Sequence, residues 1–190
     1  MAENAHSGLE LELHFMPRFF VDNPGAMTPH VHRFYQIIWF RRGHGVHRVD
    51  FVDYPVVDNT IFFIAPGQTH SFDGLRDYEG VIIHFNDSFM ADEESSESVF
   101  LKYDVFSAYD ALPYYRVTHE EATRLLTLVN EMNREYSLTG AFAHKDYMQY
   151  LVRLFLIRVQ RNGERSQKTK LYVNSVANRT FVRFRQQLER

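Results

Sequence analysis

Two histidines that stand two residues apart open the part of the chain richest in ligand-type side chains. His30 and His32 are followed by Gln36, and His70 comes later, after a Pro-Gly turn. If residues 30–41 form a β-strand, alternate side chains share a face, which would carry both histidines and the glutamine. With His70 on a neighbouring strand, the pattern predicts a binding site for a metal ion or an organic molecule.

Three alternatives account for these side chains. Three imidazoles with an open coordination position could hold a divalent metal such as Zn, Ni or Fe, with His30, His32, His70 and Gln36 as the ligands. The chain has no cysteine, so thiolate ligands are excluded. A cavity for an organic effector would use a wider ligand-binding set, namely His30, His32, Phe34, Gln36, His70 and His84. The same residues could instead satisfy one another by hydrogen bonds without a ligand.

The elements that must position these residues are predicted to be strands. Short apolar stretches separated by Gly, Pro and Asp run over residues 9–116, which is typical of a β-sandwich or barrel. We expect hairpin turns at Gly43–Gly45 and at Asp73–Gly74. The first of these turns would leave His44 and His47 facing solvent.

The period of the apolar pattern becomes helical at Thr118. Thr118 and Glu121 form a capping box, which predicts that a helix begins here and continues to residue 137. A second helix is predicted over residues 142–161 and is apolar around much of its circumference. One side of it can pack on the first helix. The other can cover the outside of the sheet, where Trp39 points, or contact a second copy of the chain.

The charge is unevenly distributed along the chain. The formal net charge is −3, but residues 162–190 contain seven Lys or Arg and two Glu. This basic end, with a helical apolar pattern over residues 171–190, indicates a segment that leads toward a polyanion. No apolar run is long enough for a membrane span, and no catalytic triad, phosphate loop or pair of carboxylates is evident. No secretory signal is visible, so we expect a cytoplasmic protein.

Two segments resemble the two motifs of the cupin jelly roll. The first is His30-x-His32, with Gln36 and Gly43 at fixed spacing, and the second is the Pro-Gly segment ending at His70. The family has an acid where this chain has Gln36. A barrel with these motifs, two helices, a basic linker and a final helix resembles the N-terminal half of AraC-type transcriptional regulators. The resemblance implies a mainly β fold, a cupin-like jelly-roll barrel followed by an α-helical hairpin and a C-terminal helix.

The same resemblance implies the domains and the partners. Residues 1–116 would be the effector-binding barrel, 117–163 the dimerisation hairpin, and 164–190 a basic linker with the opening helix of a helix-turn-helix domain. The barrel would bind a small-molecule effector, and a homodimer would form through helix 142–161. DNA would be bound only through a C-terminal domain missing from the chain. The residues expected near the twofold axis are Leu151, Leu154, Phe155 and Arg158.

We therefore expect a bacterial-type transcription regulator domain rather than an enzyme. The alternative is a stand-alone metal-dependent cupin enzyme, such as a dioxygenase or an isomerase. That function requires a metal at His30, His32 and His70 with an open coordination position.

Overall fold

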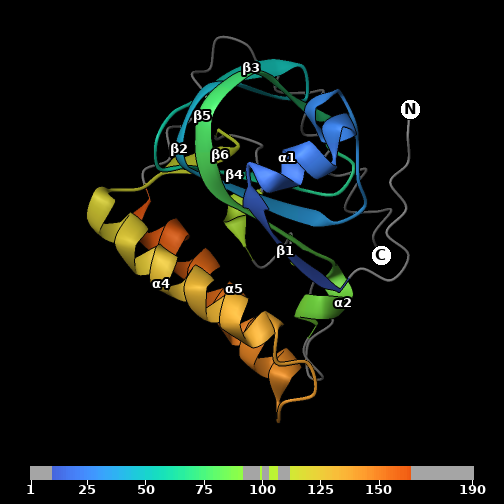
Figure 1. Cartoon of the computed structure of the whole chain (residues 1–190), viewed down its shortest axis with the longest axis vertical. Coiled ribbons are helices and arrows are strands. Elements are labelled where there is room, and N and C mark those ends of the chain that lie inside the picture. The colour runs from blue at the N-terminus through green and yellow to red at the C-terminus, as the bar shows by residue number, and fades with distance from the viewer. Residues whose placement is uncertain (1–9, 92–98, 100–102, 107–111, 164–190) are drawn as a thin grey trace.

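In the part of the chain that the structure describes, six strands form one antiparallel sheet that curls around an interior, and two long helices lie against its outside (Figure 1). The computed structural model describes residues 10–91, 99, 103–106 and 112–163. The helix expected over residues 171–190 lies outside these residues. The elements in chain order are β1 (Leu11–Met16), α1 (Arg18–Asp22), η1 (Pro24–Met27), β2 (Tyr35–Val49), β3 (Val52–Val56), β4 (Thr60–Ile64), β5 (His70–Phe85), α2 (Asp87–Met90), η2 (Asp104–Phe106), β6 (Tyr114–Arg116), α4 (His119–Tyr136) and α5 (His144–Asn162).

The two longest strands, β2 and β5, pair with each other in the centre of the sheet. The strand order is β1-β5-β2-β4-β6, and β3 pairs with β2. The register places Gln36 opposite His84 and Trp39 opposite Val81. A mainly antiparallel β fold with helices after it confirms the predicted cupin-like class.

The predicted hairpin turns at Gly43–Gly45 and Asp73–Gly74 are wrong. β2 continues through the first position and β5 through the second, and the two strands stay paired across this region with register shifts. A Cβ atom on Gly45 would lie 2.9 Å from the carbonyl oxygen of Asp73. Glycine is therefore needed where two backbones approach closely at a bend in long strands, and it does not mark a turn.

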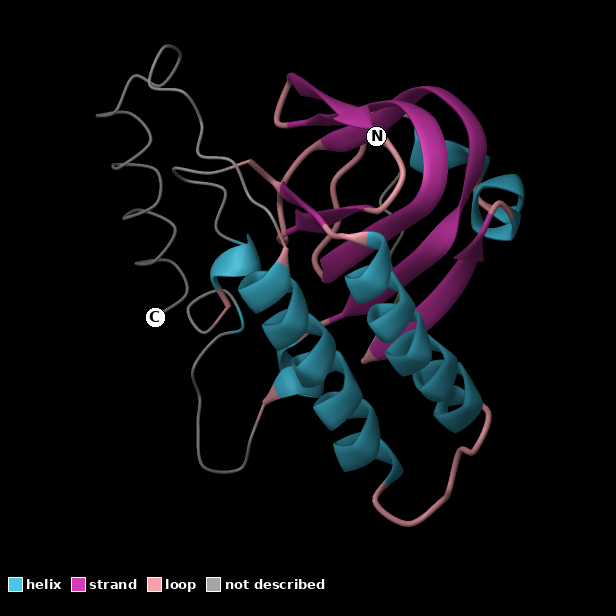
Figure 2. Ribbon diagram, turned by 90° about the vertical axis from the view of Figure 1, so that its left-hand side faces the viewer, coloured by secondary structure: helices cyan, strands magenta, loops and turns pink. Residues whose placement is uncertain are grey.

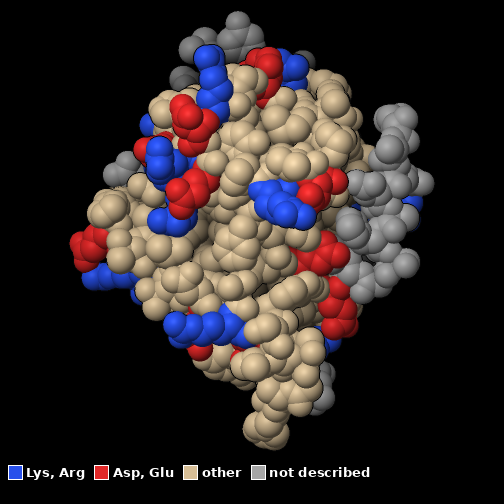
Figure 3. All heavy atoms as spheres, viewed as in Figure 1, with Lys and Arg blue, Asp and Glu red and all other residues tan. Residues whose placement is uncertain are grey.

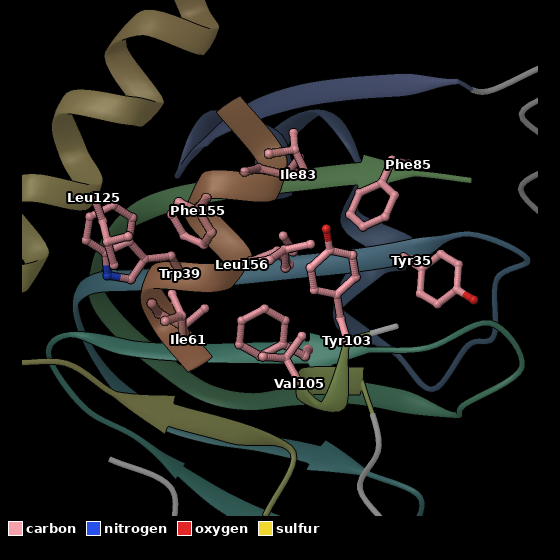
Figure 4. Packing of buried hydrophobic residues seen from close by; sticks show 14 of the residues in the cluster. Tyr35, Trp39, Ile61, Ile83, Phe85, Tyr103, Val105, Leu125, Phe155 and Leu156 are labelled. Carbon is pink, nitrogen blue, oxygen red and sulfur yellow. The ribbon is translucent and has the colours of Figure 1, made fainter. Parts of the chain in front are cut away.

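The alternation along β2 separates two apolar clusters, as predicted. Ile38 and Phe40 belong to the cluster inside the curled sheet, which we call the inner face. Ile37 and Trp39 belong to a larger cluster on the outer face, which includes residues of α4 and α5. The ring centroids of Trp39 and Phe155 of α5 lie 6.0 Å apart (Figure 4). Helix α5 thus covers the outer face of the strand that carries the predicted site.

Helices α4 and α5 form the predicted hairpin and lie side by side (Figure 2). The Thr118 hydroxyl caps α4 by accepting a hydrogen bond from the Glu121 N–H at 3.2 Å. The buried carboxylate of Glu121 accepts two hydrogen bonds from the Arg158 guanidinium of α5, at 2.7 and 2.9 Å. This bidentate pair fixes the two helices against each other. None of the described helices combines the length and the apolar content that crossing a membrane requires.

Candidate functional site

The segment before β2 brings two histidines to the inner face, although it is not a strand. The prediction of a strand over residues 30–41 is wrong at its start, because β2 begins only at Tyr35. His30 instead forms an isolated bridge with His70, in which each backbone N–H donates to the other carbonyl, at 3.0 and 3.1 Å. A backbone bridge, rather than alternation along one strand, therefore places His30 beside His70.

Four imidazole rings gather at this bridge. The ring centroids of His30 and His70 are 4.2 Å apart, and those of His32 and His70 are 5.1 Å apart. The fourth ring is that of His47, whose Nε2 lies 3.1 Å from Nδ1 of His70. The structure thus brings together the three predicted histidines and adds a fourth.

The expectation that His47 faces solvent is wrong, because no turn precedes it. β2 continues past Gly45, and the register shifts between β2 and β5 leave His47 and Val49 buried. Their neighbours Arg48 and Asp50 are exposed. This alternation of buried-type and charged residues after Gly45 is the signal in the sequence that identifies His47 as an inward-facing residue.

Gln36 links His32 to His84 on the inner face. His32 Nδ1 lies 2.7 Å from the Phe34 carbonyl oxygen, and His32 Nε2 lies 3.1 Å from one end of the Gln36 carboxamide. The other end of that carboxamide lies 2.8 Å from His84 Nε2. A neutral His32 donates through Nδ1 to the carbonyl, so its Nε2 must accept. Gln36 satisfies both neighbours when its nitrogen donates to His32 and its oxygen accepts from the His84 Nε2–H, since the two ends of a carboxamide have the same shape.

Burial keeps these histidines neutral. Desolvation, with a smaller contribution from neighbouring imidazoles, lowers the pKa of His32 and the pKa of His47 to about 3. The pKa of His70 is also lowered well below its ordinary value, first by burial and then by the proximity of His47. At neutral pH His32, His47 and His70 therefore offer hydrogen bonds rather than positive charge.

The His47–His70 pair has two polar atoms left for a ligand. One ring donates to the other between His47 Nε2 and His70 Nδ1. Because each neutral imidazole carries one proton, the remaining atoms, His47 Nδ1 and His70 Nε2, are one donor and one acceptor whichever ring donates. Both atoms are buried, and neither has a hydrogen-bond partner among the described residues. These two atoms lie at the outer ends of the linked rings, so together they match a ligand with one acceptor and one donor at separate positions.

Aromatic rings pack around the imidazoles. Phe72 stacks on His47 with the ring centroids 4.3 Å apart. Phe34 stacks on His32 at 4.2 Å and lies 4.5 Å from His84. Apolar walls with a few convergent polar groups are typical of sites for small organic molecules. We call the predicted ligand-binding residues together with His47 the inner cluster, which is His30, His32, Phe34, Gln36, His47, His70 and His84.

The predicted metal ligands do not fit a metal ion. The ligand atoms of His30, His32 and His70 do not all lie within 4.8 Å of one another. Both ring nitrogens of His32 are already engaged, by the Phe34 carbonyl and by Gln36. Gln36 is also a weak neutral group where the cupin motif has an acid. This geometry gives no support to the enzyme alternative, which needs a metal at these three histidines.

The four residues predicted near a twofold axis are divided between the core and the surface. Leu151 and Phe155 are buried in the core of the chain itself, and Arg158 bonds Glu121. Burial therefore corrects the assignments of Leu151 and Phe155, whereas the assignment of the partly exposed Arg158 stays a prediction. Leu154 presents its side chain to solvent. It belongs to a set of exposed apolar side chains on α5, here called the α5 stripe, which consists of Tyr147, Tyr150, Leu154 and Ile157.

Comparison with known proteins places the chain in a family of ligand-binding domains. Residues 22–138 match the family model of AraC-like ligand-binding domains. Among solved structures, the chain is similar to the AraC-like transcriptional activator CuxR, with 12% identity, a TM-score of 0.47, and 94% of this chain and 58% of that chain covered. It is also similar to ToxT from Vibrio cholerae, with 12% identity, a TM-score of 0.37, and 80% and 56% covered.

The chain spans a little more than half the length of these two proteins, at 58% and 56%. Another similar structure is ToxT bound to (E)-4-(8-methylnaphthalen-1-yl)but-3-enoic acid, with 12% identity, a TM-score of 0.36, and 80% and 57% covered. A search of curated protein sequences found no match.

Proposed function

Since the chain belongs to the family of AraC-like ligand-binding domains, we propose that it is the effector-sensing and dimerisation part of an AraC-type transcription regulator. A small organic molecule binds at the inner cluster, and a C-terminal domain outside this chain binds DNA in the cytoplasm. On the face that Figure 3 shows, Lys and Arg side chains are interspersed with Asp and Glu. That face lacks the large basic patch expected of a DNA-binding surface.

The observation that carries the proposal is the pair of buried atoms, His47 Nδ1 and His70 Nε2, without partners among the described residues. An unsatisfied buried polar atom costs about 1–3 kcal/mol, and a ligand that bonds both atoms recovers this cost. The neutral imidazoles and the stacked rings of Phe34 and Phe72 favour an effector with separate donor and acceptor groups on an apolar body.

The strand that carries the site also carries the contact to the helices. Gln36 of the inner cluster lies three residues from Trp39, which packs on Phe155 of α5. A ligand that changes the position of Gln36 therefore acts on the strand against which α5 is packed. The proposed mechanism is a population shift, in which the effector favours one arrangement of sheet and helices over another.

Dimerisation is proposed through the exposed side of α5. The side chains of the α5 stripe recur at spacings of three and four residues, so they lie along one face of the helix. A twofold axis across this face would bury the same residues of both copies, with Leu154 retained from the sequence prediction.

The test begins with a thermal-shift screen of a metabolite library on the chain, followed by calorimetry of each hit. A ligand at about 100 times its Kd stabilises the folded chain by about 2.7 kcal/mol, which such a screen detects. We expect the hits to bind His47→Leu/His70→Leu at least tenfold more weakly, because both bonding atoms are removed. The matched control is His44→Leu, an exposed position on the same strand. If every hit binds the double variant as tightly as the wild type, the inner cluster is not the effector site.

A further inference from the structure

A second group of ligand-type side chains lies where β1 pairs with β5. Glu12 of β1 stands directly opposite His84 of β5, and His14 is two residues further along the same face of β1. Among the described residues, these three form the only group of His, Asp or Glu side chains whose ligand atoms all lie within 4.8 Å of one another. We propose that Glu12, His14 and His84 bind a first-row divalent cation of the Zn²⁺ type.

The donor set and its spacing fit such a cation. Two imidazoles and one carboxylate are a known zinc-binding combination that leaves a fourth position for water. Tetrahedral Zn²⁺ with bonds near 2.0–2.1 Å separates its ligand atoms by roughly 3.3 Å. The Glu12 Oε2 atom accepts a hydrogen bond from His14 Nε2 at 3.0 Å, which a cation would replace, and lies 3.6 Å from His84 Nδ1. A small adjustment of these side chains therefore completes the site without movement of the strands.

The hydrogen bonds of Gln36 set the protonation of His84 in favour of a cation. When the Gln36 oxygen accepts from His84 Nε2–H, the neutral His84 ring carries a lone pair on Nδ1. That lone pair and the Glu12 carboxylate then face each other as two acceptors. A cation between them removes the repulsion. The Gln36 carboxamide is then the second hydrogen-bond partner that a metal-binding histidine normally has on its other ring nitrogen.

Burial and neighbours support binding from the β1 side. The side chain of His84 is 3% exposed, whereas those of Glu12 and His14 are 25% and 31% exposed, so a hydrated ion can reach the group. The ring centroid of Phe19 lies 4.9 Å from that of His14 and 5.7 Å from that of His84. These apolar surroundings exclude part of the water and strengthen the attraction between the cation and Glu12.

The site is distinct from the ligands that the cupin motif predicts, and a cation can bind there whether or not an effector is present. It shares His84 with the inner cluster. In the metal-free alternative, the His14–Glu12 hydrogen bond and a proton on His84 or Glu12 take the place of the cation. The two accounts differ in one measurable respect, which is saturable binding of a metal that depends on Glu12 and His14.

The experiment is a calorimetric titration of Zn²⁺ into tag-free chain that has been stripped with a chelator. We expect one equivalent to bind with a Kd in the micromolar range or below. Glu12→Gln and His14→Gln should each weaken binding at least tenfold, because each removes one ligand. His119→Gln, at an exposed position on α4, should bind like the wild type. His70→Gln, within the inner cluster, should also retain the affinity.

A second measurement guards against variants that fail to fold. Co²⁺ bound to the wild-type chain should show the strong visible bands of a four-coordinate site, and Zn²⁺ should displace it. The proposal is overturned by no saturable Zn²⁺ binding in the micromolar range. It is equally overturned if folded Glu12→Gln and His14→Gln bind as tightly as the wild type, or if His70→Gln alone abolishes binding.

Discussion

Acid should destabilise the chain through its buried histidines. The pKa of His47 is lowered to about 3 in the folded chain, against an ordinary value of 6.5, because the ring is desolvated. As the pH falls, the unfolded chain protonates His47 near pH 6.5, whereas the folded chain does so only near pH 3. The contribution of His47 to the unfolding free energy is therefore complete above pH 6.5 and is lost as the pH falls toward 3. At pH 5 the loss from His47 is about 2 kcal/mol, because one pKa unit corresponds to about 1.36 kcal/mol.

The assay compares urea unfolding of the wild type and His47→Leu at pH 8 and pH 5. The substitution leaves His70 Nδ1 without its partner, which lowers the unfolding free energy at both pH 8 and pH 5. This cost cancels when the unfolding free energies at the two pH values are subtracted. The fall in unfolding free energy between pH 8 and pH 5 should therefore be smaller in His47→Leu by about 2 kcal/mol. His44→Leu, which removes an exposed histidine of the same strand, serves as the control.

The outcome separates burial from other sources of acid sensitivity. His32 and His70 have pKa values lowered in the same direction, so part of the pH dependence should remain in the variant. An equal fall in His47→Leu and in the wild type would refute the reasoning. It would mean that His47 takes up its proton in the folded chain as readily as in the unfolded chain.

Three further predictions concern the helices. Leu154→Glu should convert a dimer into a monomer in light scattering while the chain stays folded, because Leu154 is exposed and a charge there is costly only in an interface. A variant that stays dimeric would exclude the α5 stripe as the dimer interface. Phe155→Ala should lower the unfolding free energy in urea by about 3–5 kcal/mol, since the ring is fully buried against Trp39. Glu121→Gln should lower it by about 1–3 kcal/mol, because the charged bidentate bond to Arg158 is lost; an unchanged urea midpoint in either core variant would contradict the packing described.

The sequence predicts those features that depend on a local period. Alternation places Gln36 inside and Trp39 outside, and both positions follow from the two-residue repeat of a strand. The helical period and the Thr118 cap predict α4 and α5 to within a few residues. These features require only that neighbouring residues adopt the same regular conformation.

The features that the sequence does not predict depend on contacts between distant segments. Gly45 looks like a turn residue, but its role is set by the backbone of β5, which lies against it. The consequence is that β2 continues and His47 enters the inner cluster. Glu12 and His14 lie in a strand whose alternation is visible, yet their meeting with His84 depends on the register between β1 and β5. Only the long-range pairing fixes that register.

The two proposed sites are joined through one hydrogen-bonded path, and this has a thermodynamic consequence. His84 faces Glu12 through Nδ1 and Gln36 through Nε2, and the other end of Gln36 reaches His32. A cation on His84 Nδ1 fixes the proton on Nε2 and so reinforces the orientation of the Gln36 carboxamide that His32 already favours. An effector that bonds Gln36 in that orientation then binds more tightly in the presence of the cation. Because coupling between two binding equilibria is reciprocal, the same effector must raise the affinity for Zn²⁺ by the same factor.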